Sequence, residues 1–143
     1  MRALPPNPAL TQLEALIGEW DVEVPQFPGA RGRATFEWLE DGSYLRFHAD
    51  APDPAPSATL IISRDDSSET YTVFHYDSRG VSRVYQMSFG AGAWTMWRHA
   101  PGFWQRFSGT LSSDGGSIRG SWEKSPDGSS WEHDFDLIYT KTR

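Results

Sequence analysis

From Gly18 onward, the chain is punctuated by turn signals at short intervals, and apolar and polar residues alternate between them. The signals are Asp-Gly, Pro-Gly and Gly-rich pairs about eight to twelve residues apart, a spacing typical of all-β barrels and sandwiches. The segments between them predict strands at 18–25, 32–40, 44–50, 58–65, 70–77, 81–90, 93–100, 103–112, 117–125 and 131–141. We therefore expect a single domain over residues 1–143, built as an antiparallel up-and-down barrel of about ten strands.

One short helix is predicted ahead of the strands, from Pro8 to Ile17. Its apolar residues Leu10, Leu13 and Leu16 recur at helical spacing, and Gly18 supplies a C-terminal stop. We expect this helix to lie across one mouth of the barrel.

The turns also predict which residues face each other, because the length of a turn sets the register of its hairpin. Turns at Asp41-Gly42, Pro101-Gly102 and Asp114-Gly115, and a four-residue loop at Pro126–Ser129, predict the pairs Trp38–Leu45, Phe36–Phe47, Arg98–Gln105, Phe107–Trp122 and Trp122–His133. The resulting inward face is apolar and consists of Phe74, Tyr76, Tyr85, Met87, Trp94, Met96, Phe103, Phe107, Ile118, Trp122, Phe135 and Leu137. The solvent-facing side collects Arg106, Arg119, Glu123, Glu132, Asp134 and Asp136.

Composition excludes several classes of function. The chain carries 13 Lys and Arg against 19 Asp and Glu, a net charge of −6 that argues against nucleic-acid binding. It has no cysteine, which excludes thiolate metal sites and cysteine nucleophiles. No apolar run approaches the roughly 20 residues of a membrane span, and the start MRALPPNPAL lacks the apolar core of a signal peptide. We expect a cytoplasmic protein with no nucleic-acid or membrane partner.

The stretch Leu-Ile-Gly-Glu-Trp at residues 16–20, reached from a short helix and followed by a meander of hairpins, resembles the calycin superfamily. That superfamily includes lipocalins, fatty-acid-binding proteins and nitrobindin-like haem proteins. The Gly-x-Trp motif and a closing strand such as Trp131–Tyr139 are most similar to uncharacterised bacterial lipocalin-like families, and the likeness covers nearly the whole chain. It implies a barrel that binds a small apolar or amphipathic molecule. The chain differs from the nitrobindins in reading Asp-Val-Glu-Val after Trp20, where they carry a second glycine-rich stretch.

The polar residues on the predicted inward face carry most of the functional information. Arg83 and Arg98 could hold a carboxylate head group, with Gln105 and Tyr85 as hydrogen-bond partners. Two other interpretations stay open. The arginines could reach solvent at a barrel mouth, or the hairpin over residues 81–98 could be out of register by one residue at its glycine-rich turn.

His133 supports a second hypothesis. It is predicted to point into an aromatic cavity, where it could be the proximal ligand of a haem, or a hydrogen-bonded core histidine. His48, His75 and His99 are expected outside the barrel or at strand ends, so neither a zinc site nor a non-haem iron site is predicted. The alternating carboxylates Glu132, Asp134 and Asp136 indicate a solvated ion-pair ladder rather than a catalytic pair.

We therefore expect non-enzymatic binding of a small hydrophobic or amphipathic ligand, with an anionic head group where the arginines bind it. The predicted ligand-binding residues are Phe36, Trp38, Phe47, Arg83, Tyr85, Met87, Met96, Arg98, Gln105, Trp122 and His133. No catalytic residue, metal or cofactor is predicted, with haem on His133 as the alternative. An enzyme using His133 or Tyr85 as general acid or base has no further support in the sequence. Outward Trp97 and Trp104 beside Arg106 are compatible with a homodimer interface or with isolated surface aromatics.

Overall fold

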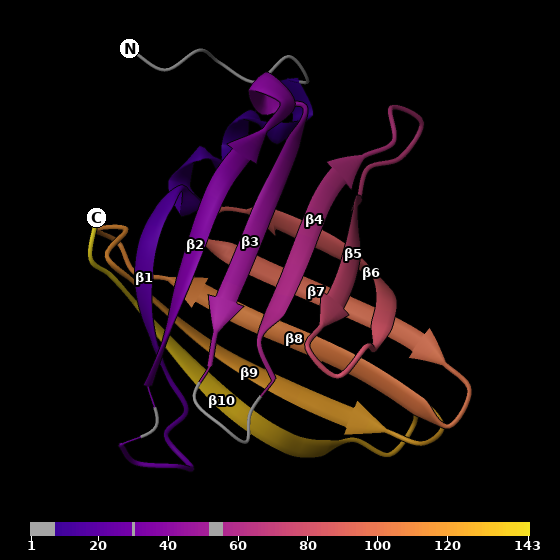
Figure 1. Cartoon of the computed structure of the whole chain (residues 1–143). Coiled ribbons are helices and arrows are strands. Elements are labelled where there is room, and N and C mark those ends of the chain that lie inside the picture. Colours follow the sequence, from indigo (N-terminus) through magenta and orange to yellow (C-terminus); the bar gives the residue numbers. More distant parts are fainter. Residues whose placement is uncertain (1–7, 30, 52–55) are drawn as a thin grey trace.

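The computed structural model describes residues 8–29, 31–51 and 56–143, and ten antiparallel strands in it form one closed barrel. Each strand pairs with its neighbours in the sequence, and β1 pairs with β10 to close the ring (Figure 1). The strands are β1 (Gly18–Glu23), β2 (Arg31–Leu39), β3 (Tyr44–Asp50), β4 (Ala58–Arg64), β5 (Tyr71–Asp77), β6 (Ser82–Gly90), β7 (Ala93–Ala100), β8 (Phe103–Leu111), β9 (Ser117–Ser125) and β10 (Glu132–Lys141). The predicted fold class is confirmed, and no predicted strand end is wrong by more than two residues.

The predicted helix is present as the 3₁₀ helix η1 (Pro8–Leu16), which packs against β4 and β6 near the top of Figure 1. Its residues Leu10, Leu13 and Leu16 are fully buried, and the Tyr71 hydroxyl donates to the Ala9 carbonyl at 2.6 Å. A second 3₁₀ helix, η2 (Glu40–Gly42), forms the β2–β3 turn at the same end. We call this end of the barrel the closed end, and the end with the turns at 78–81 and 101–102 the open end. Within the described ranges, no helix is both long and apolar enough to cross a lipid bilayer.

Three of the four predicted hairpin registers are confirmed. Trp38 pairs with Leu45, Arg98 with Gln105 and Phe107 with Trp122. The fourth is wrong, because Phe135 and not His133 lies opposite Trp122, and the register of β10 against β9 shifts between His133 and Phe135. A bulge adds one residue to a strand and so reverses the face of the residues before it. His133 therefore pairs with Glu123 on the outer face of the barrel.

The predicted orientation of β5 is also wrong. Phe74 and Tyr76 are 45% and 43% exposed on the outside, whereas Val73 and Asp77 are buried on the inner face. His75 has the same parity as these two and lies inside, not at a strand end or outside as predicted. This strand carries apolar residues on both faces, so alternation alone does not determine which face is buried.

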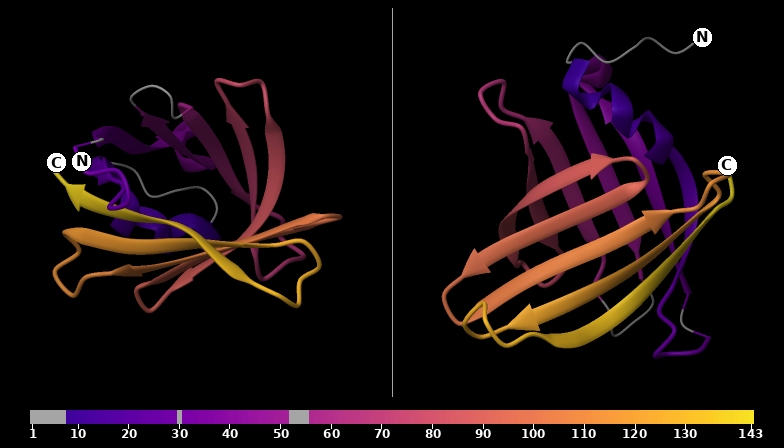
Figure 2. Two further views of the ribbon diagram at one scale, coloured as in Figure 1. Left: turned by 90° about the horizontal axis from the view of Figure 1, so that it is seen from below. Right: turned by 180° about the vertical axis from the view of Figure 1, so that it is seen from behind.

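Aromatic rings fill the middle of the barrel. Trp94 packs against Phe107 with ring centroids 4.8 Å apart and against Tyr139 at 5.9 Å, and Phe36 packs against Phe47 at 4.7 Å. Burial raises the pKa of the Tyr139 hydroxyl well above its ordinary value. The two views in Figure 2 show the strands surrounding this interior from below and from behind. The centre of the barrel is thus packed with aromatic side chains.

Candidate functional site

A cavity of about 370 Å³ lies at the open end of the barrel. Ligand pockets usually measure about 300–1,000 Å³, so this cavity suits a small ligand. Its apolar lining is Pro56, Ala58, Leu60, Met96, Phe103, Trp122 and Phe135, and its polar lining is His75, Asp77, Arg79, Arg83, Tyr85, Gln105 and Asp134. These residues come from seven strands and two connecting segments, so only the folded barrel brings them together.

The barrel wall beside this cavity is closed by side chains instead of backbone pairing. The β6–β7 ladder joins residues 86–90 to residues 93–97 and stops there, although β6 begins at Ser82 and β7 runs to Ala100. In Figure 1, the ends of β7 and β8 extend to the right beyond the β5–β6 hairpin. Past the end of the ladder, the Tyr85 hydroxyl donates to Gln105 Oε1 at 2.9 Å, and the Arg83 guanidinium lies 5.4 Å from the centre of the Phe103 ring.

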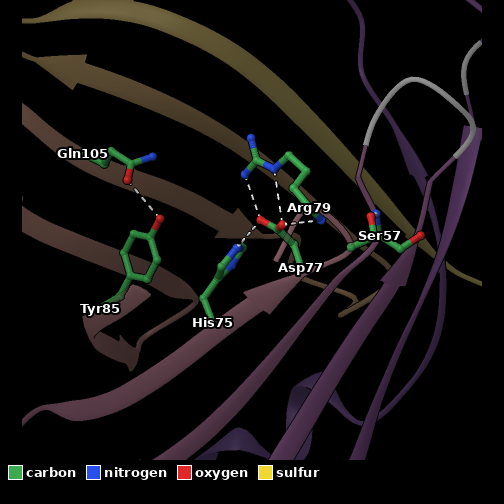
Figure 3. A network of polar contacts seen from close by, with 7 residues as sticks. Ser57, His75, Asp77, Arg79, Tyr85 and Gln105 are labelled. Atoms are coloured by element: carbon green, nitrogen blue, oxygen red, sulfur yellow. Dashed lines mark hydrogen bonds and ion pairs between the residues drawn. The ribbon is translucent and has the colours of Figure 1, made fainter. Parts of the chain in front are cut away.

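Asp77 is the centre of the polar network in this cavity (Figure 3). Its side chain is 1% exposed. The backbone N–H and Nε of Arg79 donate to its Oδ1 at 2.9 and 3.2 Å, and Arg79 Nη2 donates to its Oδ2 at 2.8 Å. His75 Nε2 lies 3.0 Å from the same Oδ2. Hydrogen bonds from Arg79 hold the pKa of the Asp77 carboxyl well below its usual range, so Asp77 is an anion that only accepts hydrogen bonds.

Arg83 differs from Arg79 in having no counter-charge. Across the described residues, no carboxylate lies within ion-pair distance of Arg83, and its guanidinium lies over the face of the Phe103 ring. Its Cα is paired with that of His75 across the β5–β6 hairpin, so both side chains project from the same face. The cavity therefore offers a guanidinium beside an imidazole, with both apolar and polar side chains around them.

The predicted ligand-binding residues fall into two groups. Those that line the cavity are Arg83, Tyr85, Met96, Gln105 and Trp122. Those that do not are Phe36 and Phe47 in the aromatic centre, Met87 in the buried core, Trp38 at the closed end, Arg98 and His133. Trp38 donates from its Nε1 to the Glu14 carboxylate at 3.1 Å, and Arg98 is half-buried opposite Gln105 without bordering the cavity.

His133 cannot serve the predicted haem site from its position. Its side chain is half exposed on the outer face, and its Nε2 lies 2.8 Å from Asp136 Oδ1. That hydrogen bond is the main reason why the pKa of the Asp136 carboxyl is lowered. An axial haem ligand needs an imidazole that faces an apolar slot. The residues around His133 do not provide one, so the structure does not fit haem bound through this residue.

Sequence reasoning missed His75, Asp77 and Arg79. Arg83 was predicted to face inward, and antiparallel pairing across the Ser78–Val81 turn places His75 directly opposite it. That turn therefore contained the signal that His75 and Asp77 face inward. Asp134, predicted on the wet face, borders the cavity because it lies at the β10 bulge. In the part of the chain that the structure describes, no group of three or more His, Asp or Glu side chains could hold a metal ion.

Comparison with known proteins identifies a structure of similar fold but gives no function. No family model matches the chain, and no curated protein matches it. Among solved structures, the chain is similar to the crystal structure of Rv2717c from M. tuberculosis, with a TM-score of 0.66 and 14% sequence identity. The similarity covers 99% of this chain and 100% of that one. At this identity, the likeness supports the shared fold alone.

Proposed function

We propose that the protein binds a small amphipathic anion, such as a medium-chain carboxylate, in the open-end cavity. The observation that carries this proposal is Arg83, a guanidinium that lines an apolar cavity and has no ion pair with any described residue. Arg83 is half-buried, and a charge that is partly removed from water without a partner costs free energy. A ligand carboxylate would remove that cost by forming charge-assisted, bidentate hydrogen bonds.

The rest of the lining fits the apolar part of such a ligand. Met96, Trp122 and Phe135 provide hydrophobic surface from β7, β9 and β10, and Leu60 adds to it from β4. Half of the lining residues are apolar, and convergent polar groups beside apolar surface are usual in a small-molecule site. The aromatic centre of the barrel limits the depth of the cavity, which favours a medium-chain ligand over a long-chain one.

Isothermal titration with octanoate tests the proposal. We expect octanoate to bind more tightly than octanol, and Arg83→Gln to weaken octanoate binding about tenfold or more, as expected for a lost hydrogen bond to a charged group. Arg119→Gln is the matched control, because Arg119 borders a separate hollow on the outer surface of β8–β10 and should leave affinity unchanged. Circular dichroism would verify that both variants are folded.

Two results would overturn the proposal. If octanoate and octanol bind equally well, the cavity does not select an anion. If neither binds and a wider panel of amphipathic acids also fails in native mass spectrometry, the open-end cavity is not a ligand site of this class.

Three expectations from the sequence remain proposals beside this one. They are membership of the calycin superfamily, a cytoplasmic location without a nucleic-acid or membrane partner, and a homodimer. For the homodimer, two of the three residues of the predicted interface, Trp104 and Arg106, already have partners within the chain. Trp104 stacks on His99 with ring centroids 4.1 Å apart, and Arg106 lies over Trp131 at 3.9 Å and bonds Glu123 at 2.8 Å. Sedimentation analysis would determine the oligomeric state.

A further inference from the structure

The cavity contains the imidazole of His75, and its hydrogen bond with Asp77 indicates which ring nitrogen carries the hydrogen. Asp77 is buried and anionic, with Arg79 donating to both of its carboxylate oxygens. An ionised carboxylate accepts hydrogen bonds and cannot donate them. His75 Nε2, at 3.0 Å from Asp77 Oδ2, must therefore carry the proton of that hydrogen bond.

This contact determines the tautomer of the neutral His75 ring. When Nε2 carries the hydrogen, Nδ1 has a free lone pair and acts as an acceptor. Over the described part of the chain, no donor is within hydrogen-bond distance of Nδ1. The ring itself borders the cavity and packs edge-on against Tyr85, with ring centroids 5.9 Å apart.

The acceptor lies next to the proposed anion site. His75 and Arg83 are direct partners across β5 and β6, and such pairs place their Cβ atoms about 4.5–5.5 Å apart. Two other polar groups of the wall are already engaged, since Tyr85 donates to Gln105 and Arg79 binds Asp77. A ligand at this position thus meets a cationic donor and a hydrogen-bond acceptor side by side, in a cavity that Gln105 and Asp134 also border.

We propose that the ligand of this cavity is a hydroxy acid, with a hydroxyl group close to its carboxylate. Arg83 binds the carboxylate, and His75 Nδ1 accepts the hydrogen bond from the hydroxyl. Asp77 acts through His75 by holding the ring in the accepting tautomer, so it is a positioning residue. This inference rests on the proposed function, because it assigns a second contact to a ligand that Arg83 already holds.

Titration of the full chain with three acids of equal chain length tests the inference: octanoate, 2-hydroxyoctanoate and 3-hydroxyoctanoate at pH 8. We expect one of the hydroxy acids to bind about threefold to tenfold more tightly than octanoate, the usual gain from one neutral hydrogen bond. In His75→Phe, which keeps an aromatic ring but no acceptor, this preference should disappear. His99→Phe is the matched control, because His99 lies outside the cavity against Trp104, and the preference should persist.

The outcomes separate this inference from the proposal on which it rests. If octanoate binds through Arg83 but neither hydroxy acid binds more tightly, the hydroxyl contact is wrong and anion binding stands. A preference that persists in His75→Phe also overturns the inference, because another group then recognises the hydroxyl. If none of the three acids binds, both proposals fall. Because the comparison is made first on the wild-type chain, misfolding of a variant does not obscure the result.

Discussion

At the scale of single residues, one aromatic ring packs closely where two glycines face each other across β8 and β9. Gly109 pairs with Gly120, and the Phe107 ring lies over the space that their missing side chains leave. That ring contacts Trp94 on one side and Trp122 on the other. Because Trp122 borders the cavity, the two glycines help to position one wall of the proposed site.

Gly120→Ala should therefore destabilise the barrel. A Cβ at this position would lie 2.5 Å from two atoms of the Phe107 ring, well inside van der Waals contact. Overpacking of this kind typically costs about 1–3 kcal/mol of unfolding free energy, which urea denaturation would measure. Gly90→Ala is the control, since its nearest neighbour would be a Gln12 side-chain atom at 3.7 Å. Equal stability of the two variants would show that Phe107 moves aside without cost.

The residues of the cavity were only partly predictable. Arg83, Tyr85 and Gln105 could be predicted because polar residues at inward positions of clear strands stand out against an apolar face. Phe36 and Phe47 also face inward, but the sequence cannot tell a ring that fills a core from one that lines a cavity. That distinction depends on how deeply the rings from all ten strands interlock, which is a property of the closed barrel.

At the scale of elements, the hairpin turns determined how well the register could be predicted. Two-residue turns such as Pro101-Gly102 permit few geometries, so the pairs beside them follow directly. The Pro126–Ser129 loop permits more, and the bulge after it moves His133 to the outer face. Nothing in the local pattern marks that bulge, because Trp131, His133 and Phe135 alternate as regularly as an unbroken strand would.

The short β6–β7 ladder predicts a specific role for Tyr85. Its hydroxyl links β6 to Gln105 on β8, where backbone pairing with β7 has ended. Tyr85→Phe should lower the unfolding free energy by about 1–2 kcal/mol, because Gln105 is buried and loses its partner. In Tyr85→Phe, hydrogen exchange should also accelerate more at residues 82–85 and 98–100 than at residues 86–90 and 93–97, where β6 and β7 are paired.

Tyr76→Phe provides the matched comparison for this link. Tyr76 is 43% exposed on the outer face of β5, so removing its hydroxyl should change stability by less than about 0.5 kcal/mol. If the two variants are equally stable and their exchange rates match, the Tyr85–Gln105 hydrogen bond does not hold β6 against β8.

At the scale of the whole molecule, the two ends of the barrel differ in what closes them. Three leucines of η1 seal one end with apolar contacts, and the centre is packed with aromatic rings. The open end contains the buried carboxylate of Asp77 and two arginines. Hydrophobic burial therefore stabilises most of the fold, while the open end depends on charge and should respond to pH.

Asp77 should make the largest single contribution to the acid sensitivity of the fold. Its pKa is lowered in the folded state, so its stabilising effect is complete above the unfolded value of about 4 and is lost as pH falls through the folded value. We expect Asp77→Asn to lower the unfolding free energy at pH 7 by about 2 kcal/mol, as for a lost hydrogen bond to a charged group. Below about pH 4, the wild-type curve should fall more steeply than that of the variant, so that the two converge.

Urea denaturation at a series of pH values from 2.5 to 7 would measure both curves. Glu132→Gln is the control, because Glu132 is 71% exposed and its nearest cation, Lys124 Nζ, is 3.9 Å away. An exposed pair of this kind contributes little to stability, so this variant should follow the wild-type curve. If Asp77→Asn runs parallel to wild type down to pH 2.5, the carboxylate of Asp77 is not what makes the open end sensitive to acid. The inference that Asp77 is an anion, on which the tautomer of His75 depends, would then lose its support as well.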